Sequence, residues 1–71
     1  MSINRNKVVK RMLETVKAVD VEAPLEIQWS PDGSILNILA DWDQETIELV
    51  AKATFANKWW ASPGAGVRLK F

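Results

Sequence analysis

Residues Leu25 to Ala40, LEIQWSPDGSILNILA, carry the clearest structural pattern in this chain. Residues 25–29 alternate apolar and polar side chains, which predicts a strand with one dry face and one wet face. Residues 30–33, Ser-Pro-Asp-Gly, predict a tight turn, because proline presets φ, aspartate bonds back to the backbone and glycine accepts positive φ. Residues 34–40 are apolar at both odd and even positions, which is typical of a strand that is central in a sheet or covered on both sides. We therefore predict an antiparallel hairpin.

The segment before the hairpin predicts a helix over roughly residues 4–20. Ser2 or Asn4 is a suitable N-cap. The residue before Pro24 avoids the α region, so the helix ends ahead of it. Apolar side chains recur at the helical period and predict one buried stripe: Val8, Val9, Met12, Leu13, Val16 and Val19.

The segment after the hairpin predicts a second helix over about residues 43–57, capped by Asp41 or Asp43. At about 100° per residue, one apolar stripe faces the sheet and another lies roughly opposite. The first stripe contains Ile47, Val50, Ala51, Thr54 and Phe55. The second contains Leu49, Ala53, Ala56 and Trp60, with Trp42 on the same side if the helical geometry extends back to it. A short chain scarcely covers both stripes, so we expect the second to be partly exposed.

The end of the chain predicts a closing strand. Residues 62–66 carry proline and glycine and interrupt the chain, and residues 67–71 then alternate with Val67, Leu69 and Phe71 inward. The resulting order is α-β-β-α-β. We predict one domain over residues 1–71, of the α+β class, in which the hairpin and the C-terminal strand pack against two helices as a small two-layer sandwich.

Composition argues for binding rather than catalysis. The 71 residues include no Cys and no His, which removes disulfides, thiolate metal sites and the commonest general base. Residues 41–45 space carboxylates like a calcium loop, but Thr46 and Lys52 stand where that loop needs Gly and Glu. Gly64-Ala65-Gly66 precedes a strand rather than a helix, so we interpret it as a hinge and not as a phosphate loop. We expect no enzyme activity, no metal and no cofactor.

Charge is segregated along the chain although it sums to zero. Residues 1–19 hold five bases and one acid, residues 20–48 hold eight acids and no base, and residues 49–71 hold four bases and no acid, so the blocks carry +4, −8 and +4. The blocks either neutralise one another in the fold or serve a partner. No apolar run reaches the length of a membrane span or a signal peptide, so we expect a cytoplasmic protein.

Four tryptophans in so short a chain favour a protein-binding module, such as an inhibitor, adaptor or assembly subunit, whose partner is a second copy or a different protein. Two alternatives are a nucleic-acid-binding domain that uses the basic face of the first helix and an acidic inhibitor that mimics DNA. The predicted partner-binding residues are Trp42, Leu49, Ala53, Ala56, Trp59 and Trp60. The alternative nucleic-acid face is Lys7, Lys10, Arg11 and Lys17. Binding through aromatic contacts is nearly indifferent to salt, whereas both electrostatic modes depend on it steeply.

Overall fold

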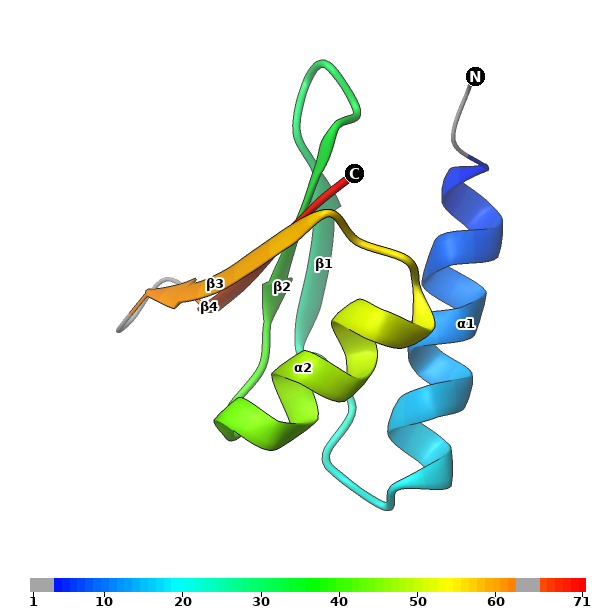
Figure 1. Cartoon of the computed structure of the whole chain (residues 1–71), viewed down its shortest axis with the longest axis vertical. Coiled ribbons are helices and arrows are strands. Elements are labelled where there is room, and N and C mark those ends of the chain that lie inside the picture. The colour runs from blue at the N-terminus through cyan, green and yellow to red at the C-terminus, as the bar shows by residue number, and fades with distance from the viewer. Residues whose placement is uncertain (1–3, 63–65) are drawn as a thin grey trace.

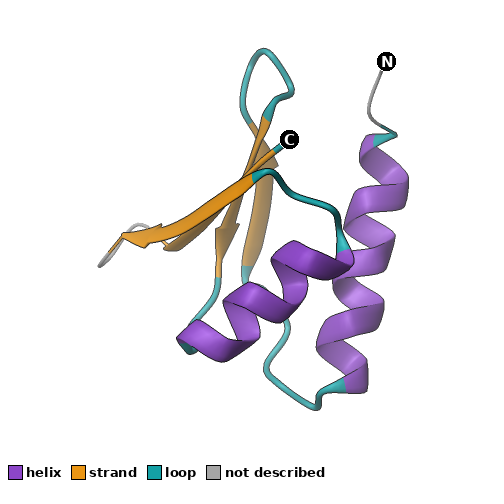
Figure 2. Cartoon of the chain, viewed as in Figure 1, coloured by secondary structure: helices purple, strands orange, loops and turns teal. Residues whose placement is uncertain are grey.

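The computed structural model describes residues 4–62 and 66–71, and these form two helices packed against one antiparallel sheet of four strands (Figure 1). The elements in chain order are α1 (Arg5–Ala18), β1 (Glu26–Trp29), β2 (Ile35–Leu39), α2 (Gln44–Ala53), β3 (Lys58–Ser62) and β4 (Gly66–Lys70). The helices form one layer and the strands the other (Figure 2). The predicted small α+β architecture is confirmed.

The sheet runs in the order β1-β2-β4-β3. The predicted hairpin is its first half, with Glu26 opposite Leu39 and Trp29 opposite Leu36. The turn closes through hydrogen bonds from the Gly33 amide to the Ser30 carbonyl and from the Ser30 amide to the Ile35 carbonyl, each 2.8 Å. Strand β2 pairs with β1 on one side and β4 on the other, so its predicted central position is confirmed.

Strand β3 is an element that the sequence does not predict. Residues 58–62 pair with β4 along their whole length, from Lys58 opposite Lys70 to Ser62 opposite Gly66. Helix α2 correspondingly ends at Ala53 rather than near Asn57, because Phe55 adopts a φ of 62° and leaves the helical path. The hinge predicted at Gly64 and Ala65 lies outside the described residues.

The core lies between the helices and one face of the sheet. Strands β2 and β4 contribute alternate residues that are 0–2% exposed, and both helices cover them. The buried apolar residues are Met12, Val16, Leu36, Ile38, Trp42, Ile47, Val50, Ala51, Val67 and Leu69. The inward facing predicted for Val67 and Leu69 is therefore confirmed, and Phe71 lies half-buried with its ring 5.7 Å from that of Trp29.

The predicted buried stripe of the first helix is too wide. Met12 and Val16 are buried, but Leu13 is 42% and Val19 37% exposed. Helix α1 packs chiefly on α2, and one neighbouring helix covers only the line of side chains that faces it. Phe55 is a second correction, because it was expected to face the sheet and is 74% exposed.

Both helices begin at residues that the sequence offers as caps. The Asn4 side chain accepts a hydrogen bond from the Lys7 amide at 3.1 Å, and the Asp43 carboxylate accepts one from the Thr46 amide at 2.8 Å. Each bond satisfies an amide that has no partner within its helix.

The turn between β1 and β2 is held by Asp32. Its carboxylate accepts hydrogen bonds from the Ser30 hydroxyl at 2.6 Å and from the amide and hydroxyl of Ser34 at 3.1 and 2.9 Å. These bonds favour the charged form, with that from the Ser30 side chain the strongest, and they lower the pKa of Asp32 from 3.8 to about 2. Hydrogen bonds from Thr46 likewise lower the pKa of Asp43. Two of the acids in the negative block therefore stabilise a turn and a helix end.

The lowered pKa of Asp32 predicts an acid-sensitive fold. A carboxyl whose pKa is lower in the folded state contributes stability that is present above its unfolded pKa and is lost as pH falls through the folded pKa. We therefore expect the melting temperature to decline between about pH 4 and pH 2. Asp32→Asn should flatten part of this decline, because residue 32 then takes up no proton. An unchanged decline in that variant would contradict the role assigned to Asp32.

Candidate nucleic-acid interface

The six residues of the predicted aromatic surface do not form one surface. That surface requires residues 42–60 to follow a single helix, but the described helix covers only Gln44–Ala53. Leu49, on α2, is 43% exposed. Ala53 is half-buried on the same helix, and Ala56 lies beyond it, packed against the core.

Trp42 belongs to the interior. Its side chain is 9% exposed and lies in the core cluster. The indole nitrogen donates a hydrogen bond of 2.9 Å to the Glu22 carbonyl, which satisfies its polar atom inside the protein. Trp42 therefore anchors the loop before α2 and is not available to a partner as the predicted surface required.

Trp59 and Trp60 are separated by the sheet itself. They are consecutive residues of β3, and successive side chains of a strand point to opposite faces. Trp59 packs against the core on the side covered by the helices. Trp60 therefore lies on the other side, where it is half-buried. One tryptophan of the predicted surface thus lies on a sheet face that the helices leave uncovered.

We call that side of the sheet the open face. Strand alternation and the register place on it the side chains of Glu26, Gln28, Ile35, Asn37, Leu39, Lys58, Trp60, Arg68 and Lys70. One row crosses all four strands, from Gln28 through Asn37 and Arg68 to Trp60. At the β1–β2 end of this row, a depression of about 150 Å³ is bordered by Glu26, Gln28, Asn37, Ile38 and Leu39.

Positive charge is concentrated at the β3–β4 end of the open face. Lys58 lies opposite Lys70, and Arg68 lies opposite Trp60. All three cations are exposed, and neither strand contains an acid. Like charges directly opposite each other on adjacent strands destabilise a sheet. The pairing of Lys58 with Lys70 is therefore unfavourable for folding, and an anion bound beside them would reduce their repulsion. Glu26, the acid assigned to this face, lies on β1 at the opposite edge.

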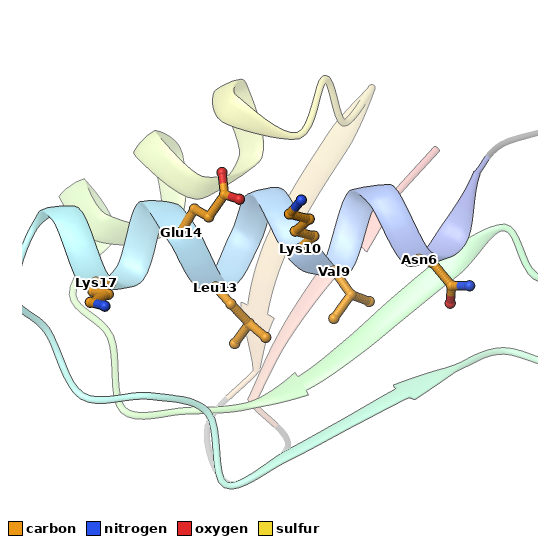
Figure 3. A pocket seen from close by; sticks show the side chains of 6 residues that line it. All are labelled: Asn6, Val9, Lys10, Leu13, Glu14 and Lys17. Carbon is orange, nitrogen blue, oxygen red and sulfur yellow. The ribbon is translucent and has the colours of Figure 1, made fainter.

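The basic residues predicted as the alternative nucleic-acid face lie on α1, in the other layer. Lys7, Lys10, Arg11 and Lys17 are all exposed on this helix. Lys10 and Lys17 line a groove of about 390 Å³ together with Asn6, Val9, Leu13 and Glu14, and Val9 and Leu13 project to the same side of the helix (Figure 3). Lys7 and Arg11 line a different pocket, beside Phe55.

Sequence reasoning did not predict the open face as a site. The alternation of residues 67–71 already turns Arg68 and Lys70 away from the core. The alternation of residues 67–71 cannot indicate that β3 pairs with β4 and adds Trp60 and Lys58 to the same face. Gln28 and Asn37 are polar positions within the predicted hairpin, and the strand order then brings them into the same row.

Within residues 4–62 and 66–71, no three Asp or Glu side chains are grouped so that they could hold a metal ion. Neither helix of the described segments has the length and apolar character needed to cross a membrane. Comparison of the chain with protein families, with curated proteins and with solved structures found no match.

Proposed function

We propose that this domain is a non-catalytic module that binds single-stranded nucleic acid on its open face. The observation that carries the proposal is the placement of Trp60 opposite Arg68, with Lys58 and Lys70 opposite each other beside them. Proteins that bind single strands combine aromatic side chains, on which bases stack, with cations that contact the phosphates. Here Trp60 supplies the stacking surface and the three cations supply the phosphate contacts.

A single strand fits the open face better than a duplex does. A sheet face presents no helix that could enter a major groove. Trp60 lies within a strand, so a base must already be unstacked to reach its ring. The amides of Gln28 and Asn37 continue the same row and offer donors and acceptors to exposed base edges. Three cations are also few for a duplex, but they suffice for a short single strand.

Trp60→Ala should weaken binding of a labelled oligothymidylate by about 5- to 150-fold, because base–aromatic stacking contributes about 1–3 kcal/mol per base. Fluorescence anisotropy at low salt measures the effect. Three phosphate contacts predict a slope of about −2 in a plot of log K against log salt, and Lys70→Ala should reduce this slope by about 0.7. Trp60→Ala should leave the slope unchanged.

Two lysines on the helix layer serve as matched controls. Lys52, on the exposed side of α2, should be neutral when changed to Ala. Lys10, on α1, tests the alternative basic face. A loss of affinity with Lys10→Ala but not with Lys70→Ala would move the site to α1 and overturn the open-face proposal.

A protein partner is the second candidate function, and the exposed apolar side chains of the helix layer favour it. Leu13 and Leu49 are 42% and 43% exposed, although each lies on a helix that also carries buried apolar residues. Binding through such residues would be nearly independent of salt. Absence of oligonucleotide binding, combined with self-association that Leu49→Ala abolishes, would favour this function over nucleic-acid binding.

A further inference from the structure

Phe55 occupies a backbone position that folding does not favour for a phenylalanine. It follows Thr54, the C-cap of α2, and has a φ of 62°. Its amide donates to the Lys52 carbonyl at 3.2 Å, and the next amide, of Ala56, donates to the Ala51 carbonyl at 3.0 Å. This way of ending a helix usually takes Gly, because a Cβ in the left-handed region is unfavourable.

Burial of the Phe55 side chain does little to offset this strain, because the residue is 74% exposed. Helix α1 offers a comparison within the same protein. It ends in the same way, with Asp20 at a φ of 55°, and aspartate tolerates that conformation. Burial therefore does not account for a strained aromatic residue at this position, and strained residues of this kind tend to occur at functional sites.

The surroundings of Phe55 indicate the chemistry of what the ring contacts. A pocket of about 200 Å³ is lined by Asn4, Lys7, Val8, Arg11, Thr54 and Phe55. The guanidinium carbon of Arg11 lies 5.2 Å from the Phe55 ring centroid, and Lys7 is one helical turn from Arg11. The Thr54 hydroxyl donates to the Val50 and Ala51 carbonyls. The pocket thus joins an aromatic wall to two cations and contains no acid.

We propose that Phe55, Lys7 and Arg11 form a second nucleotide-binding position, in which a base stacks on Phe55 and its phosphate contacts the two cations. The pocket is smaller than the roughly 300–1,000 Å³ typical of small-molecule sites, which suits one unit of a polymer better than a free cofactor. This inference rests on the proposed function and extends it, since one nucleic-acid strand would then stack on two aromatic side chains, Trp60 and Phe55.

The chain path makes the two positions reachable by one strand. Phe55 and Lys58 are three residues apart, so their Cα atoms are separated by at most about 11 Å. Lys58 is the first residue of β3 and belongs to the open face, and the Asn57 amide bonds to the Lys70 carbonyl at 2.8 Å. A bound nucleic-acid strand that leaves the open face at Lys58 therefore passes round the β3 edge of the sheet to reach Phe55.

The test measures affinity against oligonucleotide length. Oligothymidylates from about 4 to about 16 nucleotides span the range of known single-strand sites on small domains. The wild-type protein should bind longer strands more tightly. Phe55→Gly should weaken binding of the long strands by about 5-fold or more, leave the shortest unchanged, and keep or raise the melting temperature because glycine relieves the strain. Lys7→Ala should act in the same direction on long strands.

Each remaining outcome decides between the proposals. If Trp60→Ala weakens binding but Phe55→Gly has no effect at any length, the second position is wrong and the open-face function stands. If Phe55→Gly weakens binding at all lengths and Trp60→Ala at none, the open face is wrong and the Phe55 position stands. If Phe55→Gly lowers the melting temperature, Phe55 is a structural residue and the inference fails. If no oligonucleotide binds the wild-type protein, both proposals fail.

Discussion

Replacing Met12 with alanine should lower the free energy of unfolding by about 2–5 kcal/mol, the range for removing most of a large buried side chain. Met12 is 0% exposed and lies in the core between α1, α2 and the sheet. A domain of this size rarely has more than about 3–5 kcal/mol of stability. The variant should therefore be largely unfolded, or close to it, at room temperature. Urea denaturation followed by tryptophan fluorescence measures the loss.

Leu13→Ala is the matched control, because it removes a side chain of similar size from the adjacent position of the same helix. Leu13 is 42% exposed, so its truncation removes less buried area and should cost less than half as much as Met12→Ala. The sequence stripe includes both residues and does not distinguish between them. Equal losses, or a larger loss for Leu13, would mean that α1 is rotated relative to this structure.

Gly66→Ala should be comparably damaging, for a backbone reason. Gly66 has a φ of 84°, and a Cβ added to it would overlap the carbonyl oxygen of Ile38. That oxygen belongs to β2, which is paired on both sides and cannot move away from β4 without breaking the sheet. The strained φ costs about 1–3 kcal/mol and the forced overlap about as much again, so we expect a loss of about 2–6 kcal/mol.

Gly33→Ala isolates the contribution of the overlap. Gly33 has a similar φ of 75°, but a Cβ there would meet the guanidinium of Arg5, which is the far end of a flexible side chain. Arg5 can move, at the cost of its contact 5.9 Å from the Trp29 ring centroid. We expect about 1–3 kcal/mol for Gly33→Ala, from the strain alone. If the two glycine variants lose equal stability, the close approach of β4 to β2 does not control the fold.

The parts of the fold that were predicted correctly depend on neighbours in the chain. The hairpin follows from strand alternation and from the turn chemistry of Pro31, Asp32 and Gly33, whose groups act within a few residues of one another. The N-caps Asn4 and Asp43 bond to amides three residues ahead. The exposed charges of β4 follow from its alternation. Interactions between residues only a few positions apart can be predicted from the sequence itself.

The parts that were missed depend on pairings distant in the sequence. The segment Lys58–Ser62 lacks alternation and adopts a strand because β4 offers it a paired edge. The helical period could not show that α2 stops at Ala53, since Phe55 in the left-handed region is an uncommon way to end a helix. The predicted Trp42–Trp60 surface assumed one continuous helix, whereas α2 covers only Gln44–Ala53.

Local chemistry along the chain is enough to predict two capped helices, a hairpin and a closing strand. Which side chains of these elements come together depends on strand order and on helix packing. Strand order and register bring Trp60 beside Arg68 and Lys58 beside Lys70, and the packing of α1 on α2 buries Met12 while leaving Leu13 exposed. Local preferences act over about one turn or one strand, whereas register and helix packing are selected because they bury one shared core.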